Sequence, residues 1–463
     1  MFTAWLVERW DASFQGGGAP RSLRTWSVLG LLVGAAALAR PQCALWAVIL
    51  VPAALDDVRR ARAARPPASP APLASLGRQA RSWMAGAALA LLVFAPQMLA
   101  WKALYGAYLV TPQGPGFMWW GEPAWSEVLF SSRNGLLPWA PLLALAAAGL
   151  LVAAVRTPRV GIWLLAGVCL QVVVNGAAWD WWAGGSFGGR RFDSAYIAFA
   201  FGLGAVLARD PRDPRDPRGP LDRAARAAVA AALLLAILLA AANLELAARA
   251  SGPTVRVLGG EPASRVLART IPGPLAPLAA AASTAVSFPA RLVFAWRHGT
   301  SLGAYDRVVG VHQLGELYPG LNTVRAETRH EIALDRPGEA LLGLRPGPLP
   351  GAAVMTGRAA RVLVGLNRRD PIAFTIRASA PAAPAAPTTS APAASPPSIE
   401  LLLDGEPLAR GPLSAAPTTL TGTTPRARRG VNVLEIRAPP GTTLHSLELR
   451  ATGDPTGRVR GRS

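Results

Sequence analysis

Seven apolar runs, separated by polar and proline-containing stretches, place the strongest constraint on how this chain folds. A helix needs roughly 17 to 25 apolar residues to cross the hydrocarbon core of a bilayer, and the longer runs reach that length. We therefore expect a polytopic α-helical membrane protein with about seven transmembrane helices. The runs cover residues 26–39, 43–55, 83–101, 136–155, 160–174, 194–208 and 227–246.

The first two runs are short and meet at the sequence ARPQ, residues 39–42. One long helix kinked at Pro41 is an alternative, but it would leave Arg40 near the bilayer centre at a cost of roughly 3 kcal/mol or more. We predict two helices with ARPQ at their junction.

Composition agrees with a membrane protein, because 51% of the 463 residues are hydrophobic, 16% are charged and the mean hydropathy is positive. The formal net charge of +20 raises the question of nucleic acid. However, Lys102 is the single lysine and the arginines are scattered through loops, so we expect no nucleic-acid partner. Cys43 and Cys169 lie inside apolar runs, where a thiol behaves as a small hydrophobe, and they predict no disulfide framework.

Arginine placement predicts the orientation, because Lys and Arg near membrane segments are retained on the cytoplasmic side. Three arginine-bearing loops alternate correctly for this: 56–82, 156–159 and 209–226, of which the last contains a DPR repeat that we interpret as a solvated linker. We expect a multi-pass protein of the cell inner membrane, with residues 1–25 cytoplasmic. The ARPQ turn, the loops 102–135 and 175–193 and the C-terminal domain then lie outside the cytoplasm. Glu8 and Arg9 stand where the apolar part of a cleavable signal would begin.

The chain changes character near residue 247. Residues 247–327 are predicted to be an extracytoplasmic connecting segment, because Pro274, Pro277, Pro289 and Arg291 interrupt its apolar part and favour a surface or interfacial position over an eighth span. If it did span, the C-terminal domain would be cytoplasmic.

Residues 328–463 are predicted to form a small β-sandwich with a Pro/Ala-rich loop at 379–397. Short β-prone runs bounded by turn signals carry this prediction. We expect a structural or docking module, with lectin-like sugar binding as the alternative. The runs are HEIAL, RVLVGL, IAFTIRA, IELLLDGEPL, VNVLEIRAPPG and LHSLELRA.

The stretch NGAAWDWWAGGSFGGRRFDSAY, residues 175–196, combines three features that suggest a ligand site. Trp179, Trp181 and Trp182 suit an interfacial aromatic belt, and tryptophan faces also suit sugar rings or isoprenoid tails. Arg190 and Arg191 present guanidinium groups on the noncytoplasmic side, against the usual bias, and arginine forks suit phosphate oxygens. The four glycines at 184, 185, 188 and 189 permit close backbone approach. The predicted ligand is a lipid-phosphate-linked sugar.

Further candidates for substrate binding have simpler structural explanations beside the functional one. Arg40 contacts lipid phosphate or caps its turn, and Asp180 binds substrate or pairs with Arg190 or Arg191. Glu122 and Glu127, in the external loop GFMWWGEPAWSEVLF, are bases near the membrane surface or solvated loop acids. Arg133 and Asn134 close the turn into the fourth helix or reach phosphate. The four histidines, His298, His312, His330 and His445, share no ligand spacing, so we expect no metal and no cofactor.

Three motifs resemble bacterial integral-membrane glycosyltransferases of the GT-C superfamily, in the dolichyl-phosphate-mannose and arabinose-transferase-like group. The resemblance covers about Trp26 to Leu246, and residues 291–310 are similar to the segment that follows the last helix in such proteins. It implies transfer of a sugar from a polyprenyl-phosphate donor to an acceptor outside the cytoplasm, usually with inversion. The motifs are LGLLVGAAALARPQ, EVLFSSRNGLLPWAPLLALAAAGL and DWWAGGSFGGRRFD.

One departure from this family matters. GT-C enzymes carry a catalytic acidic residue after their first transmembrane helix, and further helices precede the first motif; residues 1–25 look like a short remnant of that part. The chain resembles the C-terminal half of such an enzyme, so no catalytic residue is carried over and a partner chain could supply the missing half. A noncatalytic membrane protein presenting the β-sandwich for interaction is the main alternative. A transporter is disfavoured, because Gln171, Asn175 and Pro96 are the exceptions in otherwise uniformly apolar helices.

Overall fold

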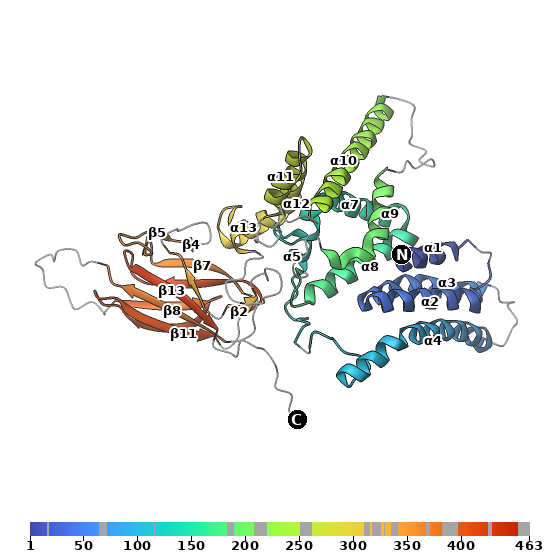
Figure 1. The fold of residues 1–463 in the computed structure, drawn as a ribbon, viewed down its shortest axis with the longest axis horizontal. Coiled ribbons are helices and arrows are strands. Elements are labelled where there is room, and N and C mark those ends of the chain that lie inside the picture. The colour runs from blue at the N-terminus through green and yellow to red at the C-terminus, as the bar shows by residue number, and fades with distance from the viewer. Residues whose placement is uncertain are drawn as a thin grey trace, which may run out of the picture. The chain divides into compact units, whose positions relative to one another are not determined.

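The protein is described here by a computed structural model in which two compact units are formed (Figure 1). The helical unit consists of Met1–Val128, Ala140–Ala183 and Gly189–Glu245, and the C-terminal unit contains Leu129–Trp139 and Leu246–Ser463. The structure describes residues 1–15, 18–63, 72–114, 116–182, 189–207, 220–250, 262–309, 315–316, 326–327, 329–334, 341–366, 371–381, 397–424 and 428–451.

Helices occupy most of the described part of the helical unit. Five of the described helices in the whole chain are long and apolar enough to cross a membrane, namely Pro41–Ala63, Gly77–Tyr105, Pro158–Ala177, Ala230–Arg249 and Leu275–His298. The chain order is α1 Phe2–Ala12, α2 Leu23–Ala39, η1 Pro41–Ile49, α3 Leu50–Ala63, α4 Pro72–Tyr105, α5 Trp125–Phe130, α6 Leu136–Trp139, α7 Pro141–Arg156, α8 Pro158–Ala177, η2 Arg190–Ala195, α9 Tyr196–Leu207 and α10 Pro220–Ala250.

The predicted break at ARPQ is confirmed. Arg40 ends α2 with an extended backbone (φ −158°, ψ 119°), because the ring of Pro41 disfavours a helical conformation at the preceding residue. Pro41 then begins the 3-10 helix η1, which continues into α3 as far as Ala63. The expectation that the second helix ends near residue 55 was wrong, and Arg59, Arg60 and Arg62 are helical.

The predicted fourth helix, 136–155, is in two pieces. Ala140 is non-helical (φ −130°, ψ 74°) because it precedes Pro141, which begins α7. The boundary between the two units falls at this break: the short helix α6, Leu136–Trp139, belongs to the C-terminal unit, and α7 belongs to the helical unit. The DPR repeat and glycines 184, 185 and 188 lie outside the described residues.

Small residues let pairs of apolar helices approach closely. A Cβ atom added to Gly34 of α2 would lie 2.6 Å from the carbonyl oxygen of Ala90 in α4, and one added to Gly86 of α4 would lie 2.6 Å from that of Trp26. Gly149 of α7 meets Gly202 of α9 in the same way. In Figure 1, α2 and α4 lie side by side. Such contacts are typical of helix packing in membranes, where dispersion replaces the hydrophobic driving force.

The N-terminal segment, interpreted as a remnant from its sequence, forms the packed helix α1. Leu6 and Trp10 are fully buried, and α1 packs on α2. An ion pair between Asp11 and Arg159 (Oδ1–Nη2 3.0 Å) joins α1 to α8.

The connecting segment of the C-terminal unit is mainly helical where the structure describes it, and it also contains the short strands β1 Gly315–Glu316 and β2 Ala326–Glu327. Its helices are α11 Ala263–Thr270, α12 Leu275–His298 and α13 Ala304–Val308. The expectation that Pro289 interrupts the segment was wrong, since α12 continues through it. Pro274 is the N-cap of α12 and Pro277 lies in its first turn, where a missing N–H leaves no bond unmade, so only Pro289 removes an interior hydrogen bond.

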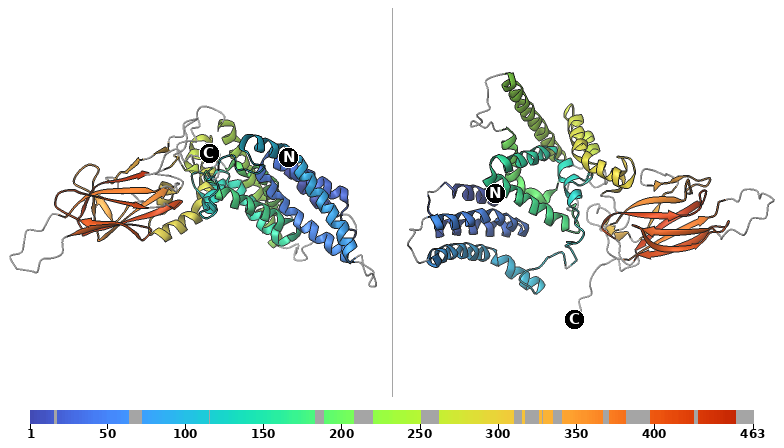
Figure 2. Two further views of the ribbon diagram at one scale, coloured as in Figure 1. Left: turned by 90° about the horizontal axis from the view of Figure 1, so that it is seen from below. Right: turned by 180° about the vertical axis from the view of Figure 1, so that it is seen from behind.

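The β-sandwich is present and consists of two antiparallel sheets. One has the strand order β10-β9-β12-β7-β4 and the other β11-β8-β13-β6-β5, with β3 paired to β13. Figure 2 shows the sheets from two further sides. The strands β1 Gly315–Glu316 and β2 Ala326–Glu327 form a separate two-stranded sheet. The strands of the sandwich are β3 Arg329–Ile332, β4 Leu341–Leu342, β5 Leu344–Pro346, β6 Ala353–Met355, β7 Ala359–Leu366, β8 Ile372–Ser379, β9 Ser398–Leu403, β10 Glu406–Pro412, β11 Thr418–Thr424, β12 Gly430–Arg437 and β13 Thr443–Ala451.

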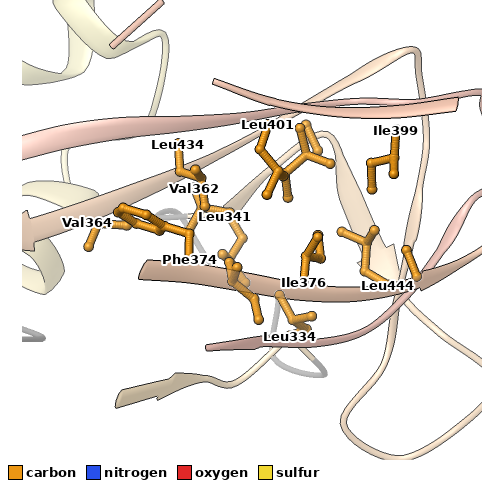
Figure 3. Close-up of a cluster of buried hydrophobic side chains, with 14 of the residues drawn as sticks. Leu334, Leu341, Val362, Val364, Phe374, Ile376, Ile399, Leu401, Leu434 and Leu444 are labelled. Carbon is orange, nitrogen blue, oxygen red and sulfur yellow. The ribbon is translucent and has the colours of Figure 1, made fainter. Parts of the chain in front are cut away.

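The hydrophobic core of the sandwich lies between the two sheets (Figure 3). Phe374 and Ile376 of β8 point from one sheet toward Leu401 of β9 and Leu434 of β12 in the other, and all four are fully buried. Alternation along β8 explains this, because period-two side chains send Phe374 and Ile376 inward and Thr375 and Arg377 outward.

All six predicted β-prone runs contain strands. Residues 382–396, most of the Pro/Ala-rich loop 379–397, lie outside the described residues, but their flanking strands β8 and β9 belong to different sheets, so this segment connects the two layers.

Candidate functional site

Arg40 stands at the centre of the polar contacts that gather at one end of the helical unit. Its Nη1 donates to Asp193 Oδ1 at 2.8 Å and to the carbonyl oxygen of Arg190 at 3.1 Å. The extended backbone at Arg40 directs the chain into η1, so the residue serves as a C-cap and its guanidinium also binds the 190–193 turn. The side chain of Arg40 is 36% exposed and that of Asp193 is 51% exposed, so the pair is accessible from solvent.

Arg190 and Arg191 have different surroundings, although they are neighbours in η2. Gly189 precedes them in the left-handed region (φ 62°), a conformation that favours glycine. Arg191 Nη2 pairs with Asp180 Oδ1 at 2.5 Å, and its guanidinium lies 5.7 Å from the Phe117 ring centroid. Arg190 is exposed, and within the described residues its guanidinium has no hydrogen bond or ion pair. Of the two, Arg190 is therefore the one that is available to a ligand.

Glutamine and serine side chains fix the turn to the helices beneath it. Gln42 Nε2 donates to the carbonyl oxygen of Arg191 at 2.6 Å, and Gln171 Nε2 donates to the carbonyl oxygen of Gln42 at 3.2 Å. Trp46 Nε1 donates to Ser194 Oγ at 3.1 Å. These bonds connect η1, α8 and η2, so the position of the Arg190 backbone is set by three elements.

Two of the three tryptophans of the motif are buried, whereas Trp179 is half-buried. Trp181 and Trp182 are 5% and 3% exposed, and their rings pack edge to face with centroids 5.9 Å apart. Trp182 thus has little ring surface left for a sugar. The exposed tryptophans of the neighbouring loop are Trp120 and Trp125, at 58% and 49%. They fit the amphipathic position at headgroup depth that was assigned to the buried pair.

Two loops that arginine placement assigned to one side of the membrane pair with each other. The Trp119 N–H donates to the carbonyl oxygen of Ala177 at 2.6 Å, and the Trp179 N–H donates to that of Phe117 at 2.7 Å. Close packing requires glycine at 176, where a Cβ would lie 2.5 Å from Trp125 Cδ1. Residues 117–124 of the first loop and 176–179 of the second therefore lie together.

The two glutamates of this loop are held by local contacts. Glu127 Oε2 accepts a hydrogen bond from Ser126 Oγ at 2.9 Å at the start of α5, and the Glu122 N–H donates to the carbonyl oxygen of Trp119 at 3.2 Å. Both side chains are half-buried.

An apolar cavity of about 380 Å³ lies at the junction of α2 and η1. Two residues close to Arg40 in the chain line this cavity: Ala37, three residues before it, and Pro41, the residue after it. Phe94 and Trp101 of α4 line it too, with ring centroids 5.6 Å apart. The complete lining is Val33, Gly34, Ala37, Pro41, Ala44, Ala90, Leu91, Phe94, Trp101, Leu109 and Val110.

Arg133 is not brought to this site. It belongs to the C-terminal unit, where its Nε donates to the carbonyl oxygen of Asp306 at 2.7 Å. The Ser132 hydroxyl donates to the Asp306 carboxylate, and the Gly135 N–H closes the turn on the carbonyl oxygen of Ser131. SSRNG thus forms a turn, but the bond that closes it joins Gly135 to Ser131, while Asn134 lies half-buried within it.

The sequence missed Gln42, Asp193 and Ser194 as members of the site. One signal pointed to Gln171, which is a glutamine in an otherwise apolar helix and is fully buried. Within the described residues, no cluster of three His, Cys, Asp or Glu side chains is arranged to hold a metal ion.

No protein-family model matches the chain, and no curated protein matches it. Among solved structures, the chain is similar to the C-terminal CBM6 of LamC, a marine laminarinase from Zobellia galactanivorans. The identity is 10% and the TM-score is 0.20, over 26% of this chain and 98% of that one. A likeness at this level carries no argument about function.

Proposed function

We propose that this chain is a multi-pass protein of the cell inner membrane, similar to GT-C glycosyltransferases, that binds a polyprenyl-phosphate-linked sugar and transfers the sugar to an acceptor outside the cytoplasm. In this proposal residues 1–25 are cytoplasmic, and the Arg40 site and the β-sandwich are extracytoplasmic. The substrate-binding groups are Arg40 and Arg190 for phosphate.

The observation that carries the proposal is that Pro41, which follows Arg40 in the chain, lines the apolar cavity. A polyprenyl phosphate has an apolar chain and one anionic group, so its site needs an apolar groove that ends at guanidinium groups. The cavity lined by Phe94 and Trp101 suits the isoprenoid chain. The hydrogen bonds of the Arg40 guanidinium described above use only its Nη1, and the Arg190 side chain is exposed. Both arginines therefore retain N–H donors for phosphate oxygens.

These arginines would also serve the transfer step. When an acceptor hydroxyl attacks the anomeric carbon, the bond to the phosphate oxygen breaks and the polyprenyl phosphate leaves with additional negative charge. Guanidinium groups already in place stabilise that charge where it develops. The acceptor proton passes to a base that the proposal does not identify within this chain.

A noncatalytic protein that presents the β-sandwich is the second candidate. It is favoured by the state of the two aspartates closest to the arginines: Asp180 pairs with Arg191 and Asp193 pairs with Arg40. Both carboxylates are therefore engaged in ion pairs with arginines of the same site.

Binding of polyprenyl phosphate to the full-length chain in nanodiscs tests the proposal. The double variant Arg40→Ala/Arg190→Ala should lower the affinity by at least about tenfold, because each charge-assisted hydrogen bond contributes on the order of 1.5 kcal/mol or more. Arg159→Ala is the matched control, since this arginine pairs with Asp11 and has no contact with the site among the described residues. Equal affinity of the double variant and the control would contradict the phosphate role.

A second measurement separates the two candidates. Membranes containing the chain are supplied with radiolabelled polyprenyl-phosphate sugar, and the label that enters acceptor material is counted. Transfer that requires Arg40 supports the glycosyltransferase, while binding without transfer supports the noncatalytic candidate.

A further inference from the structure

The helix α12 has large apolar side chains on its exposed side and polar side chains on its buried side, the reverse of a surface helix on a soluble protein. Its exposed stripe carries large apolar side chains: Phe288 is 46% exposed, Leu292 51%, Val293 59% and Trp296 83%. We call these four residues the 288–296 face. A soluble protein would direct such residues to its core and place polar ones outside.

Polar groups lie on the buried side of the same helix. Ser283 and Ser287 are 2% and 0% exposed. Arg291 Nε donates to Ser287 Oγ at 3.0 Å, and Arg291 Nη1 lies 3.2 Å from Asp306 Oδ2. Polar side chains that face inward while apolar ones face outward indicate that the surroundings of the outer face are lipid.

The whole of α12 is long and apolar enough to cross a membrane, but its C-terminal part packs on the β-sandwich. Ala290 and Phe294 pack with Tyr305 on the outer face of the β7 and β12 sheet, against Leu363 and Val431. The part of α12 from residue 290 onward is therefore covered by the sandwich on one side. The preceding part, residues 275–289, rises only about 22 Å, compared with the roughly 30 Å of a hydrocarbon core.

The N-terminal half of α12 also has a polar neighbour. Arg265 and Ser264 of α11 line a groove with Ala280, Ala281 and Thr284 of α12. Arg265 is exposed, and a guanidinium at the bilayer centre would cost roughly 3 kcal/mol or more. This half therefore suits a position outside the hydrocarbon core.

The end of the 288–296 face has the chemistry of a membrane interface. Trp296 is its most exposed side chain, and Arg297, also exposed, follows it. An indole ring is favoured at headgroup depth, and an adjacent guanidinium is attracted to anionic lipid phosphates.

We propose that α12 lies along the bilayer surface, with the 288–296 face inserted into the lipid interface and the opposite face holding the β-sandwich. Both ends of α12 are then on the same side of the membrane, and the sandwich lies against the lipid. This proposal does not depend on phosphate binding at Arg40, and either can fail without the other.

Labelling of the two helix ends tests the position of α12. In the full-length chain with Cys43→Ala and Cys169→Ala, single cysteines are introduced as Pro277→Cys and Ser301→Cys, before and after the main part of the helix. A membrane-impermeant maleimide is applied to intact cells and to inverted vesicles. Labelling of both positions from the same side is the expected result. Labelling from opposite sides would mean that α12 crosses the membrane and would overturn the proposal.

Lipid contact is measured in the same background. Leu292→Cys carries a bimane fluorophore, and the protein is placed in vesicles of phosphatidylethanolamine and phosphatidylglycerol that contain spin-labelled lipid. We expect a spin label near the lipid headgroup to quench the bimane at position 292 more strongly than a spin label at the end of the acyl chain. Ser446→Cys, on the far sheet of the sandwich, is the control and should keep its fluorescence. If position 292 is not quenched, the face is covered by something other than lipid, such as a second copy of the chain, and the proposal is wrong.

Discussion

Arg21 and Asp57 form a buried ion pair in the helical unit, with Nη1 2.9 Å from Oδ1 and side chains that are 2% and 0% exposed. The same carboxylate accepts hydrogen bonds from the Arg21 backbone N–H at 2.9 Å and from Trp26 Nε1 at 2.8 Å. The Arg21 guanidinium also contacts Asp56 and stacks on the Phe14 ring, 4.1 Å from its centroid. The pair therefore joins the chain before α2 to the middle of α3.

Asp57→Ala should lower the free energy of unfolding by about 3–5 kcal/mol, because it leaves the Arg21 charge buried without its main partner. Denaturant titration of the full chain in detergent measures the change. Asp11→Ala is the control: it breaks the exposed pair with Arg159 and should cost less than about 1 kcal/mol. Equal effects of the two variants would mean that Asp57 is solvated.

Gly86→Val should separate α2 from α4, since a Cβ at residue 86 would lie 2.6 Å from the Trp26 carbonyl oxygen. We expect a loss of about 1–3 kcal/mol from overpacking. Gly77→Ala in the same helix has open space around it and should be neutral or slightly stabilising. Thermal unfolding of both variants gives the comparison, and an unchanged melting temperature for Gly86→Val would contradict the close approach.

The sequence predicted the elements whose signal is local. Apolar runs predicted the membrane-type helices, and the β-prone run IAFTIRA predicted β8. It missed β11, because TTLTGTT contains little apolar alternation and pairs as the last strand of its sheet with β8. It also missed β4 and β5, which have two and three residues.

The site was predicted in part, and the reason is the distance in sequence between its members. Arg40 and Arg190 were chosen for their chemistry, but their contact spans 150 residues and no local pattern reports it. Trp182 was assigned to the surface because tryptophan is enriched at membrane interfaces, whereas tertiary packing buries it. The pairing of Asp180 with Arg191 was one of the stated alternatives, since opposite charges on the same short loop can meet.

Asp306→Ala should loosen the joint between the 131–134 turn and α12. Asp306 accepts from Ser132 Oγ at 2.5 Å and pairs with Arg291, whose side chain is 12% exposed. Loss of both contacts should reduce local stability by about 2 kcal/mol. Amide hydrogen exchange of residues 129–139 and 304–309 should therefore accelerate. Glu435→Ala, which removes an ion-pair partner of Arg437 in the sandwich, is the control and should leave the exchange of these residues unchanged. If Asp306→Ala also left their exchange unchanged, the turn would be held by its backbone alone.

His445 should make the sandwich less stable in acid. It lies at the register shift of β13, and its Nε2 is 3.0 Å from Ser379 Oγ. Burial, with the nearby Arg377 charge, lowers the pKa of His445 below the ordinary 6.5. The unfolded chain therefore binds this proton more readily, so stability is complete above pH 6.5, falls as the pH drops toward the lowered pKa, and then levels off.

Amide hydrogen exchange of β8 and β13 in the full chain, at pH 7.5 and at about pH 5.5 after correction for intrinsic rates, measures this loss. His445→Gln keeps a hydrogen-bonding group opposite Ser379 but cannot titrate in this range, so protection should become independent of pH across it. If the variant loses protection in acid as much as the natural chain does, another group is responsible and the assignment to His445 is wrong.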